Sequence, residues 1–340
     1  MVVAEVIVMD EYDVVVIGGG AAGLNGALML ARSRRSVVVI DAGAPRNAPA
    51  DGVHGLLGRD GMPPAELLER GRAEVRGYGG EIVSCVVTGV TGDGDRFAVP
   101  LADGRTLWAR RLLVTTGLVD ELPDIPGLRD RWGRDVIHCP YCHGWEVRDQ
   151  AIGVLATGPQ SMHQALLFRQ LSDDVTYFTH GGPAPTGEPA EQLAALGIRV
   201  VTGAIASIET DADRIVGVRL RDGSVVPRAV LVVSTRMVAR AGFLATLGLR
   251  PVQHPSGAGE HIPADVVGRT DVPGVWVAGN VTDLMAQVGS AAAAGAMAGA
   301  QINADLVMED VRRAVDVYPF AAAIEARVSE LVLGERRHGM

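Results

Sequence analysis

The sequence predicts an α/β fold with a parallel sheet near its N-terminus. Residues 13–17 read DVVVI, a short apolar strand, and run directly into the glycine-rich segment GGGAAG at 18–23. Residues 24–31 are rich in Ala and Leu and predict a helix, and a second apolar strand at 37–40 ends on Asp41. A strand, a glycine turn, a helix and a second strand in this order predict a Rossmann-like nucleotide-binding unit.

The glycine-rich turn has the residue types that a nucleotide pyrophosphate requires. Glycines let the backbone approach the phosphates closely, and the start of the following helix supplies free amides and the positive end of its dipole. Asp41 lies 18 residues beyond Gly23, where its carboxylate would accept hydrogen bonds from an adenosine ribose. The turn residues that we expect to contact the nucleotide are Gly18, Gly20, Ala21, Ala22 and Gly23.

The rest of the chain alternates short strands, helices and turns, which predicts a second α/β unit. The expected elements are a helix at 63–78, short strands within 82–115 with turns at 92–94 and 103–104, a linker at 119–127, a strand at 152–156, a helix at 161–171, a strand at 175–179 and a hairpin at 216–226. The chain is expected to cross back at 235–240, because an apolar strand at 275–280 follows and leads into a small-residue helix at 290–304.

Composition and charge exclude several classes of protein. The chain has 340 residues, of which 48% are hydrophobic and 43 are glycine, so we expect well-packed α/β folding. A formal net charge of -9 repels phosphate backbones and anionic lipid, so we expect neither a nucleic-acid nor a membrane partner. Apolar runs are interrupted before the roughly 18–20 residues that span a bilayer, and the N-terminus lacks a cleavable signal pattern. These observations predict a cytoplasmic protein.

Two of the three cysteines lie in the segment HCPYCHGW at 138–145. A Cys-X-X-Cys pair cycles between dithiol and disulfide and so passes two electrons at a time, and a flavin is a suitable acceptor. The alternatives are buried structural thiols or a zinc knuckle. Zinc normally needs four ligands, and no second Cys-X-X-Cys or His-X-X-X-His follows, so we expect no metal. The third cysteine, Cys85, lies in an apolar run and is expected to be a buried strand thiol.

With these elements in order, the chain resembles the low-molecular-weight thioredoxin reductases over roughly residues 13–310. The resemblance rests on the glycine turn, the TG pair at 116–117, the Cys-X-X-Cys pair and the AGN segment at 278–280. It implies FAD as cofactor and a homodimer as the assembly. The domains that it implies are a discontinuous FAD-binding domain at 1–122 and 241–340, and an inserted α/β domain at 123–240 that carries the cysteines.

The inserted domain departs from the reductases where a reductase binds NADPH. At the matching turn the chain reads ATGPQSM at 156–162, with one glycine, and Pro159 lacks an amide donor where a pyrophosphate needs one. The segment expected to lead into an arginine clamp reads YFTHGGP at 177–183, so little remains to recognise a 2'-phosphate. Arg236 and Arg240 are the alternative clamp residues. We therefore expect a degenerate NADPH-type domain.

The pattern Cys-X-X-Cys-His-Gly-Trp-Glu is similar to that of the FAD-dependent dithiol oxidases of the gliotoxin and holomycin type. The resemblance implies an enzyme that oxidises a small-molecule dithiol through Cys139 and Cys142 and passes the electrons to O2, with H2O2 as product. The alternatives are a thioredoxin-reductase-like disulfide reductase that uses NADPH or an unusual electron donor, and a non-enzymatic flavin redox sensor.

The resemblance also assigns roles around the redox pair. Cys142 would face the flavin, and Cys139 would be attacked by the substrate. His143 would take the proton of the substrate thiol or hold the Cys142 thiolate. His138 is either a second base or a loop cap, and Trp145 is expected to pack around the motif, with contact to the substrate as its alternative role.

A second group of candidates follows the glycine at 279. Asn280 stands where the reductases usually carry Asp, and an amide there can both donate and accept a hydrogen bond. Backbone amides at the start of the next helix would bind the flavin's pyrimidine oxygen. The remaining candidates are Asp283 as a catalytic group, and Arg46, Asn47, His54, Gly279, Gln287 and Val288 as FAD contacts.

Overall fold

The computed structural model describes residues 11–158, 160–317 and 322–335, and its larger sheet holds the N-terminal elements. The strand order is β3-β2-β1-β6-β5-β4, with β19 also paired to β6. The strands are β1 (Glu11–Ile17), β2 (Val37–Asp41), β3 (Glu81–Ser84), β4 (Thr91–Asp93), β5 (Arg96–Pro100), β6 (Thr106–Val114) and β19 (Val275–Val277). Parallel pairing places Ile17 level with Ile40 and Val114, so three strands end at one edge of the sheet. The predicted α/β fold class is confirmed.

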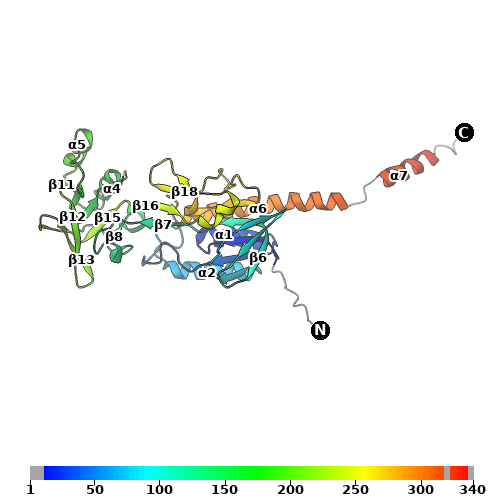
Figure 1. The fold of residues 1–340 in the computed structure, drawn as a ribbon, viewed down its shortest axis with the longest axis horizontal. Coiled ribbons are helices and arrows are strands. Elements are labelled where there is room, and N and C mark those ends of the chain that lie inside the picture. Colours follow the sequence, from blue (N-terminus) through cyan, green and yellow to red (C-terminus); the bar gives the residue numbers. More distant parts are fainter. Residues whose placement is uncertain (1–10, 159, 318–321, 336–340) are drawn as a thin grey trace.

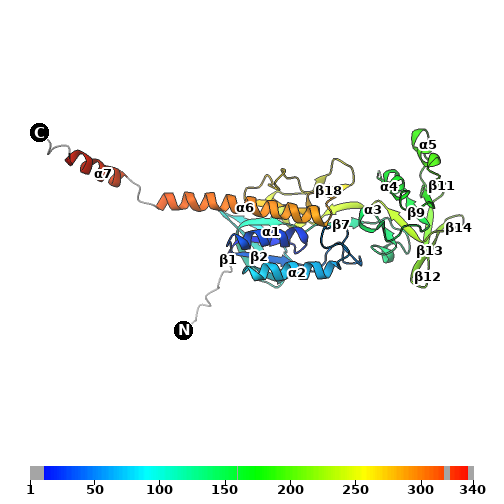
Figure 2. The same cartoon turned by 180° about the vertical axis from the view of Figure 1, so that it is seen from behind.

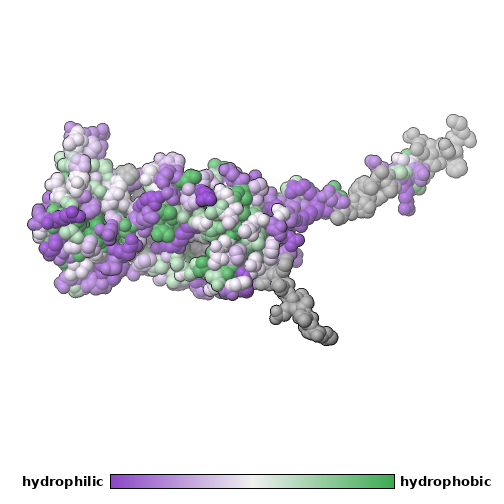
Figure 3. Space-filling view, in the orientation of Figure 1, coloured by the Kyte–Doolittle hydropathy of each residue, from purple (hydrophilic) through white to green (hydrophobic). Residues whose placement is uncertain are grey.

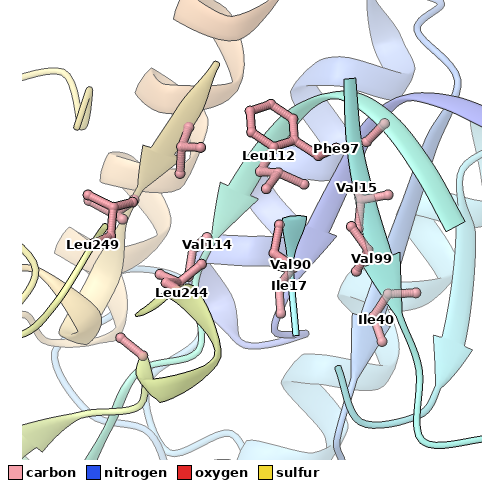
Figure 4. Close-up of a cluster of buried hydrophobic side chains, with 14 of the residues drawn as sticks. Val15, Ile17, Ile40, Val90, Phe97, Val99, Leu112, Val114, Leu244 and Leu249 are labelled. Atoms are coloured by element: carbon pink, nitrogen blue, oxygen red, sulfur yellow. The ribbon is translucent and has the colours of Figure 1, made fainter. Parts of the chain in front are cut away.

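Both faces of the larger sheet are buried. The helices on one face are α1 (Ala21–Arg32), α2 (Pro64–Gly77) and α6 (Val288–Val317), with α1 and α6 side by side (Figures 1 and 2). Val14 and Val16 of β1 pack on this face. Val15 and Ile17 point to the opposite face, where the 3-10 helix η2 (Gly242–Leu247) contributes Leu244 (Figure 4). Burial on both faces explains why β1 reads as a continuous apolar run.

A smaller parallel sheet forms the second unit, with the strand order β11-β10-β9-β15-β8. Its strands are β8 (Val136–Ile137), β9 (Ile152–Leu155), β10 (Val175–Phe178), β11 (Arg199–Val201) and β15 (Val230–Val233). The helices of this unit are η1 (Arg129–Arg131), α3 (Pro140–His143), α4 (Ser161–Phe168) and α5 (Glu188–Ala195). An antiparallel layer consists of β12 (Ile205–Asp211), β13 (Arg214–Leu220) and β14 (Val225–Pro227). The redox segment lies in this unit, between β8 and β9.

Two antiparallel strands connect the units, and they correct one expectation. The chain leaves the larger sheet through β7 (Leu118–Glu121) and returns through β16 (Arg236–Ala239), which lie between the two units in Figure 1. β17 (Val252–Gln253) and β18 (Gly259–His261) complete this sheet. Residues 119–127 were expected to be a linker, but their first part is a strand because β16 supplies its hydrogen-bond partners. The expected return at 235–240 is confirmed.

Several element boundaries differ from the expectation. The first hairpin turns at residues 94–95 rather than at 92–94, because β4 extends through Gly92 to Asp93. Cys85 lies beyond the end of β3 and is half-buried, so the expected buried strand thiol is wrong. The helix expected at 290–304 runs to residue 317, because no glycine or proline interrupts the sequence between 300 and 318.

The C-terminal part of α6 extends away from the body of the protein, and Figure 3 shows this part as mostly hydrophilic. A further helix, α7 (Ala322–Glu335), follows it in the sequence. Among the residues that the structure describes, none of the helices combines the length and the apolar character that crossing a bilayer needs.

Glycines allow α1 and α6 to cross in backbone contact. A Cβ atom at Gly295 would lie 1.9 Å from the carbonyl oxygen of Ala22, and one at Gly299 would lie 2.7 Å from that of Gly26. A Cβ at Gly26 would in turn meet the side chain of Leu113 in the sheet at 2.4 Å. Because backbone atoms cannot yield as a flexible side chain can, Gly295 and Gly299 require glycine.

We therefore predict that Gly295→Ala lowers the free energy of unfolding by about 2 kcal/mol, since overpacking outweighs the gain in helix propensity. Gly77→Ala is the matched control, because a Cβ at this end of α2 meets nothing within 4 Å. That control should leave the free energy of unfolding unchanged or raise it by up to about 1 kcal/mol. Chemical denaturation of both variants provides the measurement, and equal stabilities would contradict the close crossing.

Candidate functional site

One cavity of about 980 Å³ joins the glycine turn, the redox segment and the start of α6. This volume is in the range of cofactor and ligand sites. The sequence-predicted residues that line it are Gly18, Gly20, Ala21, Ala22, Asp41, Arg46, Asn47, His54, His138, Cys139, Cys142, His143, Gly279, Asn280, Gln287 and Val288. Two of the predicted residues, Gly23 and Asp283, are not part of the lining.

The glycine turn brings the start of α1 against the end of β1. Gly18 has a φ of +112°, and a Cβ there would lie 2.5 Å from the carbonyl oxygen of Thr115. A Cβ at Gly23 would lie 1.9 Å from the carbonyl oxygen of Gly18, so Gly23 serves helix packing and does not face the cavity. Gly20 caps α1 and has open space where its Cβ would be. The turn therefore presents bare backbone to the cavity.

Asp41 closes the same end of the cavity from β2. Its Oδ1 accepts a hydrogen bond from the amide of Gly43 at 3.1 Å, and Arg72 lies 3.6 Å from its Oδ2. A Cβ at Gly19 would collide with this carboxylate at 2.5 Å. The carboxylate is thus fixed beside the turn, at the position from which an adenosine ribose is bound in Rossmann-like folds.

The two motif cysteines form a disulfide at the start of α3. Cys139 and Cys142 are bonded with their Cα atoms 5.3 Å apart, and the amide of Cys142 donates to Cys139 Sγ at 3.1 Å. Pro140 occupies the first turn, where its missing N–H costs nothing. A Cβ at Gly144 would lie 2.2 Å from the Pro140 carbonyl oxygen and 2.4 Å from Leu171, so the segment packs tightly onto its own domain. Both sulfur-bearing residues are half-buried and line the cavity.

His143 follows the second cysteine with both ring nitrogens unpaired. Nδ1 and Nε2 are shielded from solvent, and neither has a hydrogen-bond partner among the described residues. Burial lowers the pKa of His143, which the nearby carboxylate of Glu146 opposes. The ring is therefore neutral at pH 7 and has a nitrogen lone pair available to accept a proton.

His138 is neutral as well, but its ring already contacts Arg46 and Trp132. Burial and the Arg46 guanidinium lower the pKa of His138 to about 3. Its Nε2 lies 3.3 Å from Arg46 Nη2, and its ring stacks on Trp132 with the centroids 5.5 Å apart. Of the two roles left open for His138, this favours the loop cap over the second base.

The loop after β2 contacts both the connecting strands and the redox segment. Arg46 binds Asp120 of β7 with two hydrogen bonds of 2.7 and 2.8 Å. Burial opposes ionisation of Asp120, but Arg46 keeps the pKa of this carboxyl below its usual value. His54 Nε2 lies 3.4 Å from Glu146 Oε1, and its Nδ1 lies 3.5 Å from Asp60. Arg46 and His54 line the cavity, but their polar atoms are directed to protein partners.

Asn280 organises the segment that leads into α6. Its Nδ2 donates to the carbonyl oxygens of Asp283, Leu284 and Ala286 at 2.9 to 3.3 Å. An aspartate could not donate these bonds, which gives a physical reason for the amide at this position. Asp283 itself is exposed, and its Oδ1 accepts from the amide of Met285, so the structure does not bring it together with the cysteines.

Two further residues differ from the expectation. Trp145 was expected to pack around the motif, but its side chain is 67% exposed and its ring carries the Arg148 guanidinium at 4.2 Å. Cys85, expected to be a buried strand thiol, lines the cavity. Cys85 reaches the cavity because β3 ends directly before it, at the carboxyl edge of the sheet.

The turn at 156–162 also reaches the cavity, through Thr157 and Gly158, but two of its amides are bonded to a side chain of the same turn. The amides of Thr157 and Gly158 both donate to Ser161 Oγ at 3.2 Å. Pro159 lies outside the described residues. Neither alternative arginine is free, because Arg236 pairs with Glu121 and Glu260, and Arg240 donates to the carbonyl oxygen of Ala44. The sequence reasoning missed Ser161, Gln164 and Ser234, which are joined by hydrogen bonds in this region.

Comparisons with known proteins agree with the fold. The family described as pyridine nucleotide-disulphide oxidoreductase matches residues 12–298. Thioredoxin reductase tcpT of Claviceps purpurea is 34% identical over 313 residues, which cover 86% of this chain and 95% of the relative. Thioredoxin reductase sirT of Leptosphaeria maculans is 30% identical over 309 residues, which cover 86% and 93%.

Solved structures give the same result. The crystal structure of HlmI aligns with a TM-score of 0.83 and 50% identity, over 89% of this chain and 95% of HlmI. An oxidoreductase from Agrobacterium tumefaciens aligns with a TM-score of 0.82 and 36% identity, over 88% and 99%. The glycine turn, the disulfide and these matches over most of its length show that the chain belongs to the pyridine nucleotide-disulphide oxidoreductase family and is similar to its thioredoxin reductases.

Proposed function

We propose that this protein is an FAD-dependent oxidase that converts a small-molecule dithiol into a disulfide through Cys139 and Cys142. The observation that carries the proposal is that one cavity holds the disulfide, the neutral His143 and the nucleotide-type glycine turn. The overall reaction balances as one dithiol plus O2 giving one disulfide plus H2O2. O2 is thus the proposed terminal acceptor.

The residues present fit FAD. Bare backbone at Gly18 and Gly20 leaves room for a pyrophosphate at the start of α1, where free amides favour an anion. Asp41 would hold the ribose, and the segment fixed by Asn280 would present its backbone to the flavin ring. When bound, FAD would accept two electrons from the cysteine pair and transfer them to O2.

The chain's own residues would carry the thiol chemistry. A substrate thiolate attacks Cys139 Sγ, the Cys139–Cys142 bond breaks, and Cys142 leaves as a thiolate. The second thiolate of the substrate then attacks the substrate sulfur that is bonded to Cys139. This step releases Cys139 as a thiolate and the substrate as a disulfide. His143, neutral and without a hydrogen-bond partner in the described part of the chain, accepts a thiol proton during these steps. Both electrons of the substrate are then on the cysteine pair.

The alternative function is a disulfide reductase, which is favoured by the similarity to the thioredoxin reductases tcpT and sirT. A pyridine nucleotide would have to use the turn of the second unit as an anion site. Ser161 already accepts hydrogen bonds from the amides of Thr157 and Gly158, and Arg236 is paired with two carboxylates. These contacts support the oxidase over the NADPH-dependent reductase.

We predict that Cys139→Ser and Cys142→Ser each abolish dithiol oxidation but keep FAD, because the proposed cofactor contacts do not involve sulfur. Oxygen consumption with dithiothreitol measures the activity, and the absorbance of the yellow protein measures the bound flavin. Cys85→Ser is the matched control: Cys85 lines the cavity but forms no disulfide, and serine is close to cysteine in size, so this variant should keep the thiol-dependent activity. Full activity of either motif variant would contradict the mechanism.

We predict that His143→Ala slows turnover by roughly 10- to 10⁴-fold, the usual range for an acid-base group. Because burial lowers the pKa of His143, the wild-type ring stays neutral until the pH falls through this lowered value. The acid limb of kcat/KM should therefore lie below the ordinary histidine pKa of about 6.5, and the variant should lack it. His254→Ala, at a histidine outside the cavity lining, should leave the profile unchanged. An identical profile in His143→Ala would show that this histidine is structural.

We predict that millimolar NADPH neither binds the protein nor bleaches its flavin rapidly under anaerobic conditions. The amides and arginines that a nucleotide would use are bonded within the chain. Stopped-flow absorbance compares NADPH with dithiothreitol as the positive control. Fast bleaching by NADPH would favour the reductase.

A further inference from the structure

A partly buried chain of hydrogen bonds leads from the glycine-poor turn of the second unit to the residue before Cys139. Ser161 and Gln164 lie one turn apart on α4 and are 0% and 8% exposed. Ser161 Oγ donates to Ser234 Oγ at 3.3 Å, and Ser234 Oγ donates to Gln164 Oε1 at 2.7 Å. Gln164 Nε2 then donates to the carbonyl oxygen of His138 at 2.8 Å.

The partners fix the orientation of the Gln164 amide. The His138 carbonyl can only accept, so the Gln164 nitrogen must face it and the Gln164 oxygen must face Ser234. The hydroxyl of Ser234 donates to that oxygen, and the hydroxyl of Ser161 donates to Ser234. Flipping the amide would place two oxygens in contact at the His138 end. The network therefore has one stable arrangement.

We propose that Gln164 is a positioning residue for the redox pair: by holding the His138 carbonyl oxygen, it fixes the direction in which Cys139 presents its sulfur. The inference rests on the proposed dithiol–disulfide cycle. The His138 carbonyl belongs to the peptide that enters Cys139, so its orientation sets the backbone from which the Cys139 side chain projects. That backbone is extended, with φ −108° and ψ 116°, immediately before α3 begins.

Neighbouring elements bring together Gln164, Ser234 and the His138 carbonyl, which we call the anchor. β8 ends at Ile137, one residue before His138, and pairs in parallel with β15, which ends one residue before Ser234. Ser234 and His138 therefore leave neighbouring strands at the same edge, and Gln164 reaches both from α4. β8 has only two residues, so the strand alone gives the redox segment little support.

The anchor matters most when the disulfide is open. In the oxidised protein the Cys139–Cys142 bond holds the segment in place. After a substrate dithiol has reduced that bond, hydrogen bonds must keep the Cys139 thiol beside Cys142 until the pair gives up its two electrons and two protons to the bound FAD. A displacement of about 1 Å is enough to slow such a step 10²-fold.

The test uses the FAD-loaded protein with Gln164→Glu, Gln164→Leu and Ser234→Ala. A glutamate keeps the shape and the acceptor of Gln164, but its carboxylate cannot donate to the His138 carbonyl. Gln170→Glu is the matched control, since Gln170 is exposed just beyond the same helix. Three readouts are anaerobic flavin bleaching by dithiothreitol in stopped flow, the pH profile of Cys139 alkylation in the reduced protein, and the flavin content.

We expect both Gln164 variants to bleach at least about tenfold more slowly and to show a shifted Cys139 alkylation profile, with normal flavin content. Ser234→Ala should slow bleaching and shift the alkylation profile in the same direction, but by less. If the Gln164 variants lose flavin, the Ser234→Ala variant tests the positioning role in their place. Wild-type bleaching and alkylation in all three variants would overturn the positioning role. If Cys139→Ser loses bleaching while the Gln164 variants bleach at the wild-type rate, the positioning role is wrong but the proposed function stands. If Cys139→Ser itself bleaches at the wild-type rate, the proposed function is wrong.

Discussion

Helices α1 and α6 cross with almost nothing but backbone between them, and the cavity depends on this crossing. Gly295 meets the carbonyl of Ala22, which brings segments more than 250 residues apart into direct contact. The first turns of both helices line the same cavity, from Gly20 on one side and from Gln287 on the other. If the helices moved apart by the width of a side chain, the two helix starts would no longer converge on one ligand.

Polar contacts fix the second unit against this frame. The loop after β2 carries Arg46, which binds Asp120 of a connecting strand, and His54, which contacts Glu146 beyond the redox helix. A Cβ at Gly133 would meet Pro49 of the same loop at 2.7 Å, so the two units are in close contact there as well. These contacts hold the disulfide on the wall of the cavity. An oxidase cycle needs only this arrangement, whereas a reductase must move its domains to admit a nicotinamide.

The turn at the start of α4 shows how a nucleotide-type element can acquire another role. Free amides at such a turn normally attract an anion. Here Ser161 accepts from two of them, and the hydrogen bonds continue through Ser234 and Gln164 toward the redox segment. Polar groups that are withdrawn from water in this way are stable only when they are paired, as these are. The same groups therefore cannot serve a pyrophosphate without breaking the network.

The sequence by itself determined the α/β class, the glycine turn ending in Asp41 and the redox motif, because each follows from residue periodicity or from spacing within a short segment. It did not determine that residues 118–121 would be a strand, that Cys85 would reach the cavity or that Asp283 would stay outside it. Only the tertiary structure decided the partners of His138 and Gln164. Their hydrogen bonds join residues 26 to 92 positions apart, and such pairs are set by strand register and helix packing, which no local pattern encodes.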